Sequence, residues 1–417
     1  MIGYLSLLHE APDMPEQQKE KKKYETIQTI GDIPTGFGRV SLNKKKEKIC
    51  GDYYTVITDT DQTVLVLSDG LGSGVKANIL ATLTARMLSI MIARNMDIRT
   101  AVKAVADTLP ICSVRNLAYA TFTVLVSEGN GICLLQYDNP DAILLRNGKS
   151  VDYHRDILMF GEKEIHQSYF QFRTGDMLIL MSDGVTNAGM GKTTYGGWGR
   201  EEVLKFCEQR YHKGMSAQEM ASDIADAGVA LNMDETDDDL TVLTLTGMKK
   251  NVVNIMVGPP ADRADDRSYF TTFFEKEGMR IVCGGTTAKL VADYLGEEVA
   301  GIPGTGTEEV PAMSQIKGID LVTEGLLTLQ KVIDYYEDFS EDRLYYNRII
   351  KKKDAAAELF RILFAEATEI NFFFGNALNE NYTALHIERE KKKNLALELI
   401  EALKSEGKKV KICFWCV

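Results

Sequence analysis

The sequence lacks an excess of basic residues. Its 417 residues include 48 Lys and Arg against 60 Asp and Glu, which gives a formal net charge of −12 and a pI near 5.1. Proteins that bind nucleic acids or anionic membranes through general electrostatics carry basic surfaces. We therefore expect neither a nucleic acid nor a membrane among the partners of this chain.

Long apolar runs are also missing. A membrane-spanning helix needs roughly 20 apolar residues in a row. The longest candidate, Ile79–Ile92, is interrupted by polar residues such as Thr82 and Arg86. The N-terminus shows no charged segment followed by a sustained apolar stretch, so no signal peptide is evident. These absences lead us to expect a cytoplasmic protein.

The seven cysteines do not have the spacing of a disulfide framework, and their odd number favours reduced thiols. One CxxC pair, Cys413 and Cys416, lies in an apolar C-terminal segment that is better explained as a strand than as a redox or metal motif. The five histidines lie outside the motifs described below, and no Ser/His or Cys/His pair is evident. We therefore do not expect a covalent nucleophile.

The chain contains one sequence motif twice. Four apolar residues followed by Ser-Asp-Gly form both Val64–Gly70 and Leu178–Gly184. The apolar run predicts a buried strand, so each aspartate stands where a strand leaves the core. The glycine permits a tight turn or a close backbone approach. Two such strands suggest one shared acidic site.

Two more acidic segments fit that site. Asp52 precedes the strand-like YYTVIT, and an aspartate triplet at positions 237–239 precedes the alternating LTVLTL. Clustered carboxylates raise one another's pKa unless a cation neutralises them, and oxygen ligands suit Mg²⁺ or Mn²⁺. Any one of these motifs alone is better explained as an ordinary turn. Together the four favour a two-metal site that activates water.

These motifs resemble those of a known family. GDYY, SDGLGSG, SDG and DDLTVL occur in the order found in the metal-dependent protein phosphatase 2C (PPM) superfamily. SDGLGSGVKAN before an apolar helix is similar to the SpoIIE type (stage II sporulation protein E-like), as is YDNPDAILLRNGK. The resemblance covers about residues 36–247. It implies an α+β fold, a four-layer αββα sandwich, in a bacterial signalling enzyme.

The resemblance also implies roles for individual residues. Asp69 would bridge two ions, Mn²⁺ or Mg²⁺, and Gly70 would offer its backbone carbonyl to one of them. Asp183 and Asp238 would bind the second ion, and Asp52 would hold a metal directly or through water. Asp238 is preferred to its neighbours because DDLTV matches the family pattern D-[ND]-x-T-V. The four aspartates are thus the predicted catalytic and metal-binding residues.

The activity implied by the resemblance is hydrolysis of phosphoserine or phosphothreonine on a regulatory protein, such as an anti-sigma antagonist, by direct attack of a metal-bound water. An alternative is a phosphatase-like module that senses a ligand and has little turnover. The chain departs from eukaryotic members of the family, which hold phosphate with an arginine near the first motif. Here lysines occupy that region, at positions 44–46 and 48.

The chain divides into three segments. We expect a polar leader over residues 1–23, the phosphatase 2C-like catalytic domain over 24–248, and a regulatory or ligand-binding domain over 249–417. In the last segment uniformly apolar strands alternate with helices. This order predicts an α/β doubly wound domain with a mainly parallel sheet.

One loop of the third segment is a possible ligand site. In parallel sheets ligands bind at the carboxyl ends of the strands. Gly284, Gly285, Thr286 and Thr287 follow a predicted strand and open a helix, whose free N–H groups could hold a small anion. Glu324, at another strand end, could take a hydroxyl or an amine. The alternative is a purely structural domain that forms a homodimer.

Overall fold

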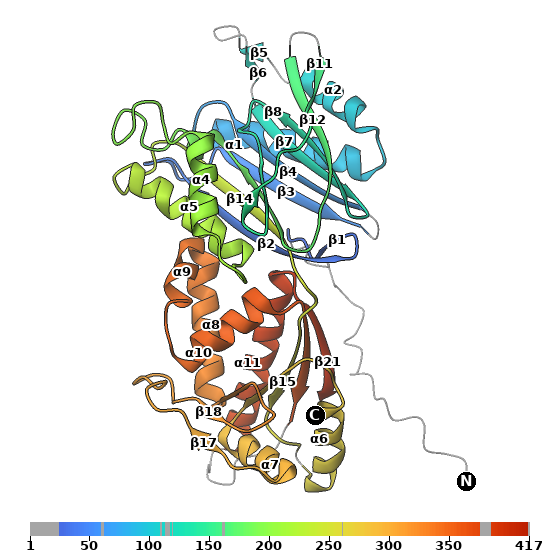
Figure 1. Ribbon diagram of the computed structural model, residues 1–417, viewed down its shortest axis with the longest axis vertical. Coiled ribbons are helices and arrows are strands. Elements are labelled where there is room, and N and C mark those ends of the chain that lie inside the picture. Colours follow the sequence, from blue (N-terminus) through green and yellow to red (C-terminus); the bar gives the residue numbers. More distant parts are fainter. Residues whose placement is uncertain are drawn as a thin grey trace, which may run out of the picture.

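The structure is a computed structural model of the chain. It describes residues 25–415 except 60–61, 109–110, 113–116, 119, 161–162, 261 and 376–384. The predicted polar leader over residues 1–23 and Cys416 of the CxxC pair lie outside the described residues. Figure 1 shows the two halves of the molecule one above the other, with the N-terminal half at the top.

The N-terminal half contains two antiparallel sheets of six strands each. The first has the order β1 (Thr29–Ile30), β2 (Ile33–Leu42), β14 (Leu240–Gly247), β13 (Asp176–Met181), β9 (Ile143–Arg146) and β10 (Lys149–Ser150). The second has the order β11 (Asp156–Phe160), β12 (Lys163–Gln171), β8 (Gly131–Tyr137), β7 (Ala120–Glu128), β4 (Gln62–Gly70) and β3 (Asp52–Thr58). A separate pair is formed by β5 (Ile111–Cys112) and β6 (Leu117–Ala118).

Helices cover the outer face of each sheet. The first sheet packs against α4 (Arg200–Arg210) and α5 (Ala217–Leu231), and the short α3 (Asp183–Thr186) lies at its end. The second packs against α1 (Gly74–Ala93) and α2 (Ile98–Thr108). A third apolar cluster fills the space between the two sheets, with residues such as Leu67 and Leu180 fully buried. The predicted four-layer αββα sandwich is therefore present.

Helix α1 is a long, mainly apolar element of the N-terminal half. By length and composition it is the one helix among the described residues that could cross a membrane, although a core helix passes the same test. Ala77, Ala81, Ala85 and Leu88 are buried where α1 packs on the sheet. This packing on the sheet explains the apolar composition of α1. In the sequence, the apolar run of the helix is interrupted by polar residues such as Thr82 and Arg86.

The C-terminal half is built on one sheet with the order β17 (Ala300–Gly301), β18 (Ser314–Gln315), β19 (Leu321–Thr323), β16 (Met279–Cys283), β15 (Val252–Val257), β20 (Glu369–Phe374) and β21 (Lys409–Trp415). The run from β19 to β21 is parallel, and β17 and β18 are antiparallel. The sheet is therefore mainly parallel, as predicted.

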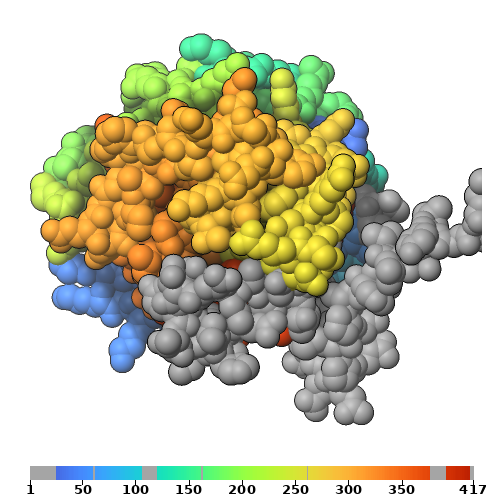
Figure 2. Space-filling view, turned by 90° about the horizontal axis from the view of Figure 1, so that it is seen from below, coloured from blue at the N-terminus to red at the C-terminus, as the bar shows by residue number. Residues whose placement is uncertain are grey.

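Both faces of this sheet are covered by helices. One face packs against α8 (Leu326–Glu341), α10 (Ala355–Phe360) and α11 (Leu385–Ser405), and the short α9 (Tyr346–Ile349) contributes Tyr346 and Ile349 to the same apolar cluster. The other face packs against α6 (Asp266–Phe274) and α7 (Gly285–Leu295). Figure 2 views the molecule from this end, where the yellow and orange segments cover most of the face.

The two halves are in direct contact. Residues 248–251 connect β14 to β15. The hydroxyl groups of Ser216 and Tyr346 lie 2.9 Å apart, and the Asn347 amide donates to Asp223 at 2.9 Å. The Ser222 hydroxyl donates to the Arg343 carbonyl at 3.1 Å. Helix α5 therefore lies between its own sheet and the start of α9, as Figure 1 shows.

Candidate metal centre

The predicted aspartates meet at one end of the sandwich. Asp52 opens β3 and stands directly opposite Asp69, near the end of the antiparallel partner β4. On the other sheet, Asp183 begins α3 immediately after β13, and Asp238 lies just before β14. The Ser182 hydroxyl donates to the Asp52 carboxylate at 2.7 Å and so links the two sheets.

The carboxylates affect one another strongly. Burial raises the pKa of Asp69 to about 10, and the charges of Asp52, Asp183 and Asp238 add to that rise. Burial also raises the pKa of Asp52 to about 7, against the opposing hydrogen bond from Ser182. The pKa of Asp238 is raised by burial and by Asp183, although Lys44 opposes the shift. The site thus holds like charges that the protein compensates only in part.

The donor set has the chemistry of a divalent-cation site. All four side chains are carboxylates, and Oδ1 of Asp52 is buried with no hydrogen-bond partner. Hard oxygen donors of this kind suit Mg²⁺ and Mn²⁺. Among the residues that the structure describes, however, no group of three or more His, Cys, Asp or Glu side chains is already arranged around a common metal position. The carboxylates are gathered and would have to draw closer to ligate an ion.

Glycine lets the backbones approach closely at this site. A Cβ on Gly70 would lie 2.0 Å from the carbonyl oxygen of Ala77, in α1, and one on Gly184 would lie 2.0 Å from the carbonyl oxygen of Asp239. Both glycines of the repeated Ser-Asp-Gly phrase are therefore required by packing. The metal-binding role of the Gly70 carbonyl stays a prediction.

The three neighbouring aspartates before β14 have different surroundings. Asp237 is exposed and pairs with Lys192 at 2.8 Å, whereas Asp238 is half-buried and lies 3.5 Å from Lys44 Nζ. Asp239 is buried and accepts the Lys44 backbone N–H at 3.0 Å. Sequence reasoning missed the structural part played by Asp239. Its position next to the apolar start of β14 was the available signal.

The lysines before Asp52 are also placed. Lys44 reaches the cluster through Asp238, as described above, while Lys45 pairs with Glu235. Of the lysines considered for holding phosphate, Lys44 therefore lies at the site. Ser182 also lies at the site, although sequence reasoning did not single it out. Its hydrogen bond fixes the orientation of the Asp52 carboxylate.

The possible ligand site of the C-terminal half is brought together in part. Gly284 lies beside Gly325, at the carboxyl ends of the paired strands β16 and β19. Thr287 is buried, while Gly285 and Thr286 are exposed. Glu324 accepts the backbone N–H of Leu327 at 3.0 Å and thereby caps α8. The strand order reverses elsewhere, between β15 and β20. A ligand at Gly284–Thr287 stays a prediction.

Comparisons with known proteins agree with the motifs. Residues 59–246 match the family model of stage II sporulation protein E (SpoIIE). Phosphoserine phosphatase RsbU of Bacillus subtilis (strain 168) is 24% identical over 220 residues, which are 50% of this chain and 62% of that protein. The chain therefore spans less than two thirds of the length of this curated relative.

Solved structures with similarity to this chain include the phosphatase domain of SpoIIE from Bacillus subtilis with a fragment of its regulatory domain. Its TM-score is 0.43 at 19% identity, over 51% of this chain and 63% of that one. The RsbU and RsbW domains of Rv1364c from Mycobacterium tuberculosis have a TM-score of 0.42 at 15% identity, over 54% and 63%. The family-model match and the motifs agree that residues 59–246 form a SpoIIE-type domain.

Proposed function

We propose that this chain is a Mg²⁺- or Mn²⁺-dependent protein phosphatase that hydrolyses phosphoserine or phosphothreonine. One observation carries the proposal. Four aspartates from four strand ends that are distant in the sequence meet at one end of the sandwich, where neighbouring carboxylates help to raise the pKa values of Asp52 and Asp69. The match of residues 59–246 to the SpoIIE family supports it. We place the catalytic domain within residues 24–248.

The residues of this chain have distinct roles in that reaction. Asp52, Asp69, Asp183 and Asp238 would hold two ions, together with the carbonyl of Gly70. When bound, such ions supply Lewis acidity, which activates water and offsets charge on phosphoryl oxygens. The Ser182 hydroxyl holds the Asp52 carboxylate in place.

Lys44 has a separate role. Its ammonium lies at the rim of the cluster, beside Asp238, where it supplies a positive charge for the phosphate of the substrate. A lysine acts there as a flexible point charge, without the fixed two-pronged geometry of an arginine. We therefore expect Lys44 to affect substrate affinity more than turnover.

The proposed substrate is a phosphorylated regulatory protein in the bacterial cytoplasm. The name of the relative, a phosphoserine phosphatase, supports this class. The C-terminal half, residues 249–417, would regulate the phosphatase by binding a ligand or by forming a homodimer. Its contacts with α5 provide a physical route for such an influence.

The test is manganese-dependent hydrolysis of p-nitrophenyl phosphate by the full chain. Asp69→Asn and Asp183→Asn conserve shape and remove a ligand charge, so each should reduce turnover at limiting Mn²⁺ by about 100-fold or more. Asp237→Asn is the matched control, because Asp237 is exposed and pairs with Lys192. It should retain activity close to that of the wild type.

Two outcomes would overturn the assignment. Undiminished activity in both Asp69→Asn and Asp183→Asn would show that the cluster does not carry the reaction. Binding of Mn²⁺ by the wild type without any turnover of phosphorylated proteins would favour the alternative, a phosphatase-like sensor. The lack of a ready ligand arrangement among the described side chains makes that second measurement worthwhile.

A further inference from the structure

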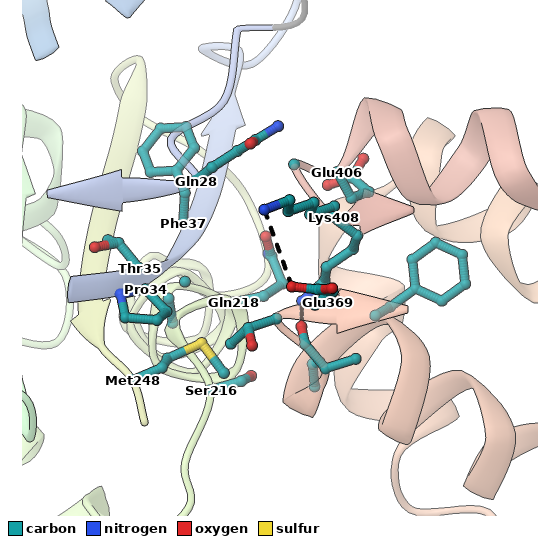
Figure 3. Close-up of a pocket in the computed structure, with 18 of the residues that line it drawn as sticks. Gln28, Pro34, Thr35, Phe37, Ser216, Gln218, Met248, Glu369, Glu406 and Lys408 are labelled. Carbon is teal, nitrogen blue, oxygen red and sulfur yellow. Dashed lines mark hydrogen bonds and ion pairs between the residues drawn. The ribbon is translucent and has the colours of Figure 1, made fainter. Parts of the chain in front are cut away.

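A cavity lies between the two halves of the molecule, and none of the four aspartates lines it. Its volume is about 210 Å³. In Figure 3, residues of the N-terminal half line one side and residues of the C-terminal half line the other. The labelled lining residues include Thr35, Phe37, Ser216, Gln218, Glu369 and Lys408. We call this space the junction cleft.

Lys408 is the most unusual residue of the junction cleft. It is only 8% exposed, and its Nζ donates to the carbonyl of Ala367 at 2.9 Å. An ammonium group has three N–H donors, and among the described residues the structure records this one acceptor for it. Burial lowers the pKa of Lys408 to about 8, against the favourable charge of Glu406. A buried cation with donors to spare thus faces the cavity.

Positive charge is in excess around the junction cleft. Glu406 is shared by Arg39, at 3.3 Å, and Arg343, at 2.9 Å. Nη1 of Arg39 is nevertheless buried without a hydrogen-bond partner. The other lining carboxylate, that of Glu369, is approached by three lysines, Lys250, Lys409 and Lys411. The whole chain has a net charge of −12, so this excess of positive charge is a local feature of the junction cleft.

The remaining walls suit the body of a small molecule. Helix α5 begins at the cleft, so that Ser216, Ala217 and Gln218 contribute the electropositive end of a 15-residue helix. Met248 and Phe364 add apolar surface. Cavities that bind small ligands combine apolar walls with a few placed polar groups in this way.

We propose that the junction cleft binds a small organic anion whose carboxylate or phosphate group is held by Lys408. The ligand contacts both halves, since β2 and α5 belong to one and β20 and β21 to the other. Binding should therefore strengthen the contact between them. The proposal is independent of the phosphatase activity, because it needs neither the aspartate cluster nor a metal.

The experiment uses the full chain with EDTA, so that no metal can recruit the anion to the aspartate cluster. Thermal melting is followed with rising concentrations of succinate in one arm and inorganic phosphate in the other. We expect a saturable rise in melting temperature in at least one arm. The arm that responds identifies the anionic group.

Lys408→Met keeps much of the side-chain volume and removes the charge, so it should weaken the apparent affinity by about tenfold or more. The control is Lys317→Met, whose lysine side chain is 85% exposed and pairs with Glu297. It should respond like the wild type. A saturable response that is undiminished in Lys408→Met would overturn the proposal, as would the absence of a saturable response in both arms for the wild type.

A second measurement does not depend on any variant. Hydrogen exchange of the wild type with the saturating anion should show added protection in β2, the start of α5, β20 and β21. Protection confined to other elements would place the ligand elsewhere and would equally overturn the proposal.

Discussion

The aspartate cluster and the junction cleft both place ionised groups out of water, but they do so with opposite arrangements of charge. At the cluster, Asp52, Asp69 and Asp238 have raised pKa values, because their neighbours carry the same sign. At the junction, Arg39 and Arg343 lower the pKa of Glu406 in spite of its burial. Charges that compensate one another account for a contact. Charges that do not compensate one another, as at the aspartate cluster, are those that a bound cation would neutralise.

The largest effect should come from breaking the compensated set. Glu406→Gln leaves Arg39 and Arg343 buried without their carboxylate, which should destabilise the protein by about 3–5 kcal/mol. Urea denaturation measures the change. Glu401→Gln is a control, since Glu401 is exposed on α11, which ends one residue before Glu406, and pairs with Lys404. Equal stability of the two variants would show that the junction charges are not coupled.

The next effect concerns the close approach of α1 to the cluster. Gly70→Ala places a methyl group against the backbone of Ala77, so α1 must move. We expect a loss of about 1–3 kcal/mol in stability and a rise of about tenfold in the Mn²⁺ concentration that gives half-maximal activity. Gly196→Ala is the control, because a Cβ at this exposed position meets open space. Unchanged metal dependence in Gly70→Ala would separate α1 from the metal site.

A smaller effect should have the opposite sign. In metal-free protein, Asp69→Asn removes a half-buried carboxyl group that is repelled by the neighbouring carboxylates of Asp52, Asp183 and Asp238. We expect its free energy of unfolding in EDTA to rise by about 1 kcal/mol, as is common when a functional site is relaxed. Mn²⁺ should then stabilise the wild type and not the variant. A clear loss of stability in EDTA would mean that Asp69 is a structural residue.

The smallest effect should be a pH dependence of stability from Lys408. Its pKa is lowered to about 8, below that of an unfolded lysine, so between these two values the unfolded chain binds more protons than the folded one. Stability from this group therefore rises as pH increases from about 8 towards 10.5. The charge that acts on it is that of Glu406, which opposes the shift. The difference in unfolding free energy between the wild type and Lys408→Met over this range isolates the contribution, and a flat difference would contradict it.

The aspartate cluster could be predicted because each of its parts is local in the sequence. An apolar run that ends in Ser-Asp-Gly predicts both a buried strand and the position of a carboxylate at its end. The four-layer sandwich was implied by the resemblance to the phosphatase 2C superfamily. The alternating order of the C-terminal half likewise indicated its mainly parallel sheet.

The junction could not be predicted in this way. Arg39 and Glu406 are separated by 367 positions, and neither belongs to a recognisable motif. Which faces of two folded halves meet depends on their surfaces, and surface pattern is not readable from periodicity. The difference between Asp238 and Asp239 was hidden for a related reason, since two identical neighbours are distinguished only by what packs on them. The boundary near residue 248 stays a prediction.

The pairing of β2 with β14 also constrains how this protein is made. Gly38 of β2 and Thr244 of β14 are 206 positions apart, a distance that takes about 10–40 s to synthesise. Until then a long strand of the nascent chain, joined only to the two residues of β1, has an open edge. Open edges are prone to pair with other chains. The sheet that contains β2 can therefore be completed only late in translation, once residues 240–247 have been made.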